Sequence, residues 1–168
     1  SSGETVTASS LTISGNAAAT ITGTLTGSDP INVSGMTTWS HGTMSGTGTT
    51  NANGGLTMTG FATRTLSGSR TLNVTGGSWT HTGISTLSLG AGTLFSIQSG
   101  TFTNGGLPSG AVSHTVSGSG VFAVAPGATF AINHASNFGV TVVSATFNNN
   151  GSVLVQNGRL TLTGGNSS

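Results

Sequence analysis

Apolar and small polar residues alternate in a short phrase that recurs along the chain and ends in Ser or Thr followed by Gly. Strict alternation is typical of a β-strand, because successive side chains point to opposite faces. The Gly that follows permits a positive φ, so the strand can end in a turn. The pattern therefore predicts short strands, each with its own corner, at Leu11–Gly15, Ile31–Gly35, Leu56–Gly60, Leu72–Gly76 and Leu160–Gly164.

Parts of the chain resemble each other at long offsets. The strand at 31–35 and the following Trp39-Ser40-His41 match the strand at 72–76 and the following Trp79-Thr80-His81. Residues 65–69 match residues 115–119 at a longer offset. If each offset spans two coils of a solenoid, one coil takes about 20 to 25 residues.

These features predict an all-β chain that forms one domain, residues 1–168, as a parallel β-helix (a β-solenoid) of about seven or eight coils. A β-sandwich is the alternative, since it also has many short strands joined by Gly-rich turns. The alternation places one set of residues in the core, namely Leu72, Val74, Phe122, Val124, Val153, Val155, Leu160 and Leu162. It places another set outside, namely Asn73, Ala123, Leu154 and Thr161.

The composition predicts that the surface of this solenoid carries few charged side chains. Only 3% of the residues are charged, and three Arg against one Glu and one Asp give a net charge of +1. Without a basic run, phosphate neutralisation cannot drive nucleic-acid binding, so no nucleic-acid partner is expected. No run of about 18 apolar residues exists, so no membrane insertion is expected. The absence of Cys excludes disulfides and thiol chemistry.

Two runs in the C-terminal half, residues 120–130 and 147–165, resemble repeats of large secreted bacterial proteins. These are the autotransporter passengers and the filamentous-haemagglutinin-like adhesins. The resemblance implies a right-handed parallel β-helix at the cell surface or outside the cell, acting as a fibre, stalk or adhesin segment of a longer repetitive protein. Such repeats share no active-site motif, so the resemblance implies no site residue.

Acid–base catalysis on a glycoside requires two carboxyl groups at a set separation. This chain has only Glu4 and Asp29, so we expect no enzymatic activity. The same shortage argues against an acidic calcium site. The His residues at positions 41 and 81 repeat at two-coil spacing, about 9 to 10 Å along the axis, which is too far for one metal ion. No catalytic residue, metal ligand or cofactor is predicted.

A ligand face is a second hypothesis for function. Trp39 and Trp79 would stack on a sugar if they pointed outward, although core packing is the preferred interpretation. Thr57, Thr59 and Asn73 would contribute to a flat face for carbohydrate or ice. Paired Thr-X-Thr sets would suit ice, but their starting positions do not recur at one spacing: Thr5, Thr20, Thr24, Thr57, Thr101 and Thr161.

The ends of the predicted β-helix suggest its partners. A solenoid leaves unpaired backbone groups on its terminal coils, and free-standing solenoids usually cover them with a cap. Neither Ser1–Ser10 nor Gly164–Ser168 has the pattern of a cap. We therefore expect end-to-end self-association or further coils of the same chain, with surface glycans as another candidate partner.

Overall fold

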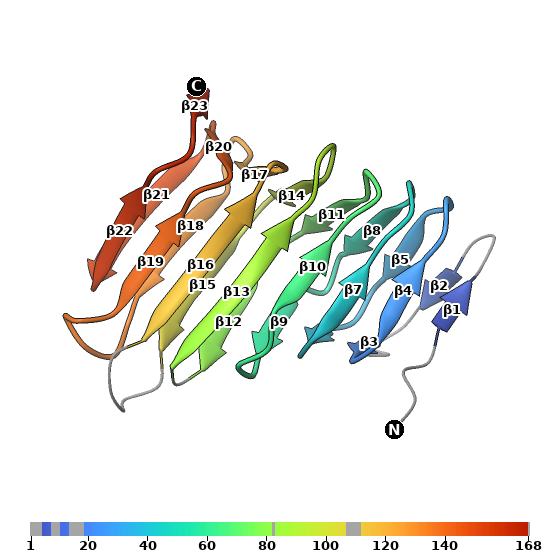
Figure 1. Ribbon diagram of the computed structural model, residues 1–168, viewed down its shortest axis with the longest axis horizontal. Coiled ribbons are helices and arrows are strands. Elements are labelled where there is room, and N and C mark those ends of the chain that lie inside the picture. The colour runs from blue at the N-terminus through green and yellow to red at the C-terminus, as the bar shows by residue number, and fades with distance from the viewer. Residues whose placement is uncertain (1–4, 8–10, 14–18, 82, 107–111, 168) are drawn as a thin grey trace.

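The chain forms a rod of short strands wound into a coil. The computed structural model describes residues 5–7, 11–13, 19–81, 83–106 and 112–167, which contain 23 strands and no helix. Every strand pair is parallel, and the strands form three sheets that run along the rod (Figure 1). The all-parallel pairing confirms the β-solenoid and excludes the β-sandwich. No helix in the described part of the chain could cross a membrane.

Each sheet takes every third strand. We call the three sheets A, B and C. Sheet A contains β1 (Thr5–Thr7), β4 (Thr24–Thr26), β7 (Gly42–Met44), β10 (Arg64–Leu66), β13 (Ile84–Leu89), β16 (Ser113–Gly118), β19 (Val140–Val143) and β22 (Arg159–Leu162). Sheet B contains β2 (Leu11–Ile13), β5 (Ile31–Val33), β8 (Thr49–Ala52), β11 (Thr71–Val74), β14 (Leu94–Ile97), β17 (Val121–Val124), β20 (Thr146–Asn149) and β23 (Asn166–Ser167). Sheet C contains β3 (Ala19–Ile21), β6 (Thr37–Trp39), β9 (Leu56–Thr59), β12 (Gly77–His81), β15 (Thr101–Gly106), β18 (Thr129–Asn133) and β21 (Ser152–Asn157).

The coil is right-handed, as expected for parallel crossovers. In Figure 1 the nearer strands, β4 to β22, rise to the upper right while the chain advances from right to left. Strands β4 to β21 make six successive turns, with β1, β2 and β3 before them and the pair β22 and β23 after them. The count therefore differs slightly from the seven or eight coils expected.

The strand register tests the internal repeats. Ile31 is aligned with Thr50, and Thr50 with Leu72, so the offset between the runs at 31–35 and 72–76 does span two coils. The alignment of residues 65–69 with 115–119 is wrong by two residues, because Thr65 is aligned with Ser88 and Ser88 with Ser117. Coils differ in length because their turns differ, so an offset measured in one sheet does not hold in the next.

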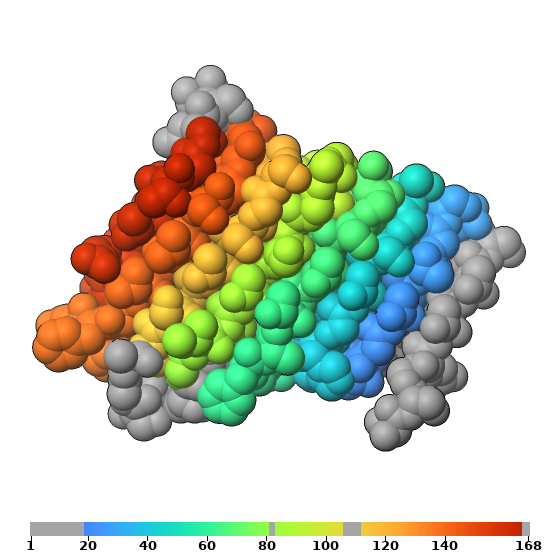
Figure 2. All heavy atoms as spheres, in the orientation of Figure 1, coloured from blue at the N-terminus to red at the C-terminus, as the bar shows by residue number. Residues whose placement is uncertain are grey.

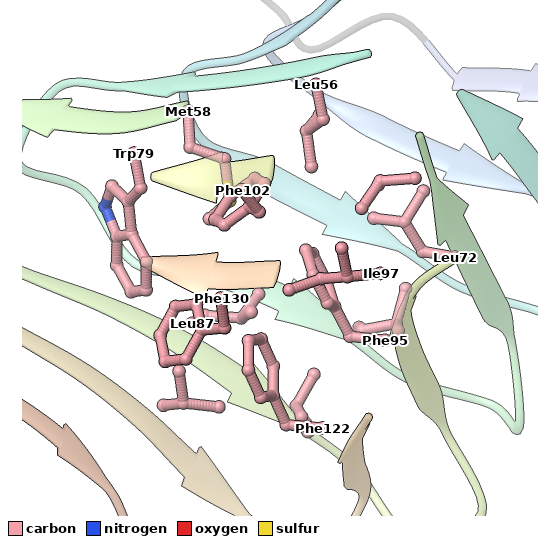
Figure 3. Packing of buried hydrophobic residues seen from close by; sticks show 14 of the residues in the cluster. Leu56, Met58, Leu72, Trp79, Leu87, Phe95, Ile97, Phe102, Phe122 and Phe130 are labelled. Atoms are coloured by element: carbon pink, nitrogen blue, oxygen red, sulfur yellow. The ribbon is translucent and has the colours of Figure 1, made fainter. Parts of the chain in front are cut away.

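The core is a stack of inward side chains from all three sheets, which converge on the axis of the rod in Figure 3. Phe95 stacks on Phe122 with ring centroids 5.2 Å apart, and Phe122 on Phe147 at 5.8 Å. Because the strands are parallel and in register, each side chain lies above its counterpart in the previous coil. The predicted core positions that are buried are Leu72, Val74, Phe122 and Val124, while Val153 and Leu160 are half-buried and pack against the same core.

Candidate functional site

The two Trp residues of the predicted ligand face lie in the core. Trp39, Met58 and Trp79 form one inward column of sheet C, and all three are at most 1% exposed. The Trp79 ring stacks on His114 at 4.8 Å, and its Nε1 donates to Ser85 Oγ at 3.1 Å. A sugar cannot reach either indole ring, so the preferred interpretation of core packing holds for both.

The other three predicted face residues lie on two different sheets. Thr57 and Thr59 point outward from β9 in sheet C, and the Thr57 hydroxyl contacts Met36 Sδ at 3.4 Å. Asn73 points outward from sheet B, where its Nδ2 donates to Asn51 Oδ1 at 2.8 Å. Asn51 in turn donates to Asn32 Oδ1 at 2.8 Å, which makes a ladder of amides along the rod. The predicted residues therefore do not form one ligand face.

A buried polar column runs along the interior where sheet C turns into sheet A. Arg64 is fully buried, and its guanidinium donates to the carbonyl oxygens of Trp39, Ala62, Thr59 and Gly60 and to Ser85 Oγ. Burial lowers the pKa of Arg64 to about 10, because desolvation disfavours its charged form. Bonded in this way, the side chain holds the backbone of this corner together.

Two His residues continue the polar column beyond Trp79. The His114 ring lies 5.4 Å from the His134 ring, and its Nδ1 contacts Asn104 Oδ1. His134 Nε2 lies 3.0 Å from Thr141 Oγ1. Both rings are at most 1% exposed, so they pack inside the rod and do not face a substrate.

Acid–base and metal chemistry find little support in the described residues. Asp29 lies in the turn between β4 and β5, half-buried, and Glu4 lies outside the described residues. His41 is exposed in the turn between β6 and β7. The described part of the chain contains no group of three His, Asp or Glu side chains that could hold a metal ion.

The most regular arrangement of chemical groups is a column of hydroxyls on the outer face of sheet A, which we call the hydroxyl ladder. Strand pairing aligns its first five members directly. Backbone hydrogen bonds from Ser144 N to Val116 O and from Thr163 N to Val143 O extend the same register. Each strand of sheet A from β4 onward contributes one member, on the strand or just after it: Thr24, Thr43, Thr65, Ser88, Ser117, Ser144 and Thr163.

Sequence reasoning missed most of this ladder. The signal was present as Ser or Thr beside each sheet A strand, but the steps are unequal: the step from Thr24 to Thr43 is much shorter than the step from Ser88 to Ser117. A search for one fixed period therefore fails. The six Thr-X-Thr sets are divided between two sheets, with those beginning at Thr5, Thr24 and Thr161 in sheet A and those at Thr20, Thr57 and Thr101 in sheet C.

The C-terminal end of the rod exposes core positions. Val155 continues the inward column of Ile132 in sheet C, and Leu162 continues that of Val143 in sheet A. Ile132 and Val143 are fully buried, whereas Val155 is 48% exposed and Leu162 is 40% exposed. The predicted inward positions of these two residues are therefore right in register, but no further coil within the described residues covers them. At the other end, the predicted uncapped segment Ser1–Ser10 lies outside the described residues except for β1.

The chain matches no protein-family model, no curated protein and no solved structure.

Proposed function

We propose that the chain is a non-enzymatic structural segment of an extracellular fibre, stalk or adhesin that extends by stacking coil upon coil. The observation that carries this proposal is the exposure of Val155 and Leu162, whose columns are fully buried one coil earlier. Apolar surface of this kind is stabilised when another coil removes it from water. The resemblance to repeats of secreted bacterial proteins supports the same proposal.

Backbone groups at this end favour the same kind of partner. Among the described strands, β21, β22 and β23 are each paired on one side only, so each presents a free strand edge. A free parallel edge accepts another strand by main-chain hydrogen bonding. The covering element is thus a β-coil with apolar residues above Val155 and Leu162, supplied by further coils of the same chain or by a neighbouring copy.

Sedimentation of the purified chain over a range of concentrations tests the stacking. We expect concentration-dependent, linear association that Val155→Asp abolishes, because the charge would be buried at the junction. Leu154→Asp is the matched control, since Leu154 is 47% exposed on the same strand but points away from the core. Association that is unchanged in Val155→Asp, or equally lost in both variants, would contradict stacking through the core columns.

The extracellular location is tested separately. Antibodies raised against the purified chain should label intact cells of its source organism. Labelling that requires permeabilised cells would contradict a surface fibre and would leave the stacking result unaffected.

A further inference from the structure

We propose that the outer face of sheet A is an ice-binding surface, on which the hydroxyl ladder holds water molecules at the spacing they have in ice. This inference does not depend on end-to-end stacking, because it concerns the side of the rod. In Figure 2, which has the orientation of Figure 1, this face shows parallel rows of side chains, one row for each coil.

The spacing of the ladder is the first argument. Neighbouring strands of a sheet lie about 4.8 Å apart, so successive ladder hydroxyls are too far apart to bond each other. A water molecule that bonds two oxygen atoms at about 2.8 Å each, at the tetrahedral angle of about 109°, holds them about 4.6 Å apart. One water molecule therefore fits between each pair of neighbouring hydroxyls with nearly tetrahedral geometry, which is its geometry in ice.

The ladder is flanked by columns that make the array two-dimensional. A step of two residues along a strand moves about 6.6 Å, so the flanking columns are parallel to the ladder at that distance. One contains Thr86, Thr115, Val142 and Thr161. The other lies at the strand ends or just beyond them and contains Thr26, Ser45, Ser67 and Gly90. None of these residues is charged; the charged side chain that points outward from sheet A, Arg159, lies on β22 at the C-terminal end of the described rod, beside these columns.

The free state of the hydroxyls is an independent argument. Among the described residues, the ladder side chains other than Ser144 make no hydrogen bond to another protein group. Sheet B differs, because Asn32, Asn51 and Asn73 use their amides to bond one another. The polar groups of sheet A therefore remain available to water, whereas much of the bonding capacity of the amide ladder is already used.

The ladder is also held rigidly, which an ordered water layer requires. Thr65 lies between Arg64, which has five acceptors in the protein, and Leu66, which is fully buried. Backbone hydrogen bonds join each strand of sheet A to its neighbours. Holding the side chains in place before binding lowers the entropy lost when ice is bound.

Thermal hysteresis and inhibition of ice recrystallisation by the purified chain test the proposal. We expect the chain to show both activities and Thr43→Lys/Thr65→Lys to lose most of each, because two long charged side chains would hold the ice surface away. The matched control is Thr57→Lys/Ser78→Lys, which places the same substitutions in the same two coils on the outer face of sheet C. The control should retain the activity of the unmodified chain.

Circular dichroism confirms that each variant folds, and Thr43→Ala/Thr65→Ala replaces the lysine variant if that one unfolds. The proposal is overturned if the unmodified chain shows neither activity, or if both lysine variants lose activity equally. It is also overturned if the chain is inactive on ice but co-sediments with crystalline cellulose or chitin, which would make the face a glycan-binding surface.

Discussion

Arg64 Nη1 donates a hydrogen bond to Ser85 Oγ across 2.8 Å, which joins two successive coils inside the rod. Arg70 is also fully buried, but its Nη1 donates only to Gly27 O, at 3.3 Å, and its Nε and Nη2 have no partner among the described residues. Burial lowers the pKa of Arg70 as it does that of Arg64. Removal of the Arg64 guanidinium would therefore leave several acceptors without this donor, whereas removal of the Arg70 guanidinium would affect only one.

Replacing each Arg by Met should have different effects on the free energy of unfolding. Arg64→Met removes the donor to four backbone carbonyls and one of the two donors to Ser85 Oγ, and we expect a loss of about 3 kcal/mol or more. Arg70→Met removes a buried charge with few bonds, so its effect should be within about 1 kcal/mol of neutral, or stabilising. Urea denaturation of the two variants measures both. Equal losses would show that the hydrogen bonds of Arg64 add nothing to stability.

The lowered pKa of Arg64 predicts a dependence of stability on alkaline pH. Its pKa is about 10 in the folded chain, lower than in the unfolded chain, so the unfolded chain binds more protons once the pH exceeds about 10. Stability attributable to this group should therefore rise as the pH increases above about 10, and should be constant at lower pH. Urea midpoints of the unmodified chain, relative to those of Arg64→Met, should increase over this interval. A difference in urea midpoint that decreases as the pH rises would contradict the predicted direction of the effect.

Position along a core column should decide the cost of a buried charge. Ile132→Asp places a carboxylate where the parent side chain is fully buried, and we expect a loss of several kcal/mol, about 3 or more. Val155→Asp, in the same column, should cost only about 1 kcal/mol in the monomer, because Val155 is 48% exposed. Melting temperatures at low protein concentration compare the two. The alternation alone places Val155 in the core, where a charge would cost as much as at Ile132, but its exposure at the end of the described column lowers the expected loss.

The amide ladder of sheet B should contribute to the free energy of unfolding, mainly through its central residue, Asn51. Asn51→Ala removes the bonds to both Asn32 and Asn73, and we expect a loss of about 1 to 2 kcal/mol. Asn53→Ala is the control, because Asn53 is exposed in the following turn and its backbone N–H keeps its bond to Val33 O. Chemical denaturation of both variants should separate them. Similar losses in the free energy of unfolding would mean that the amide–amide bonds add nothing over the bonds that these amides make with water in the unfolded chain.

Close contact between coils should make Gly42, the first residue of β7, costly to replace. Gly42 has φ +98°, and a Cβ there would lie 2.0 Å from Gly23 O, so Gly42→Ala must displace backbone. Gly127 has φ +80° with nothing within 4 Å of a Cβ, so Gly127→Ala should cost only the conformational penalty of about 1 kcal/mol. Thermal unfolding of both variants tests this difference. A smaller loss at Gly42 than at Gly127 would show that the coils can separate there without cost.

The sequence by itself determined the fold class and whether most side chains of the strands point into the core or outward. Alternation over two residues is a local property, so Leu72, Val74, Phe122 and Val124 could be placed in the core and Asn73 outside it without knowledge of their partners. The matching runs at 31–35 and 72–76 likewise predicted a two-coil repeat, because the turns between them happen to preserve the register of sheet B.

Only the tertiary structure decided which residues share a column. Turns of different length lie between the sheets, so Thr65 is aligned through Ser88 with Ser117 and not with Thr115, and the hydroxyl ladder has no fixed period in the sequence. The same reason separates Asn73 from Thr57 and Thr59, which lie on different sheets. Exposure at the end of a column also depends on the tertiary structure, since Val155 and Ile132 both occupy inward positions of their strands. They differ because Ile132 has a coil above it, whereas no described coil lies above Val155.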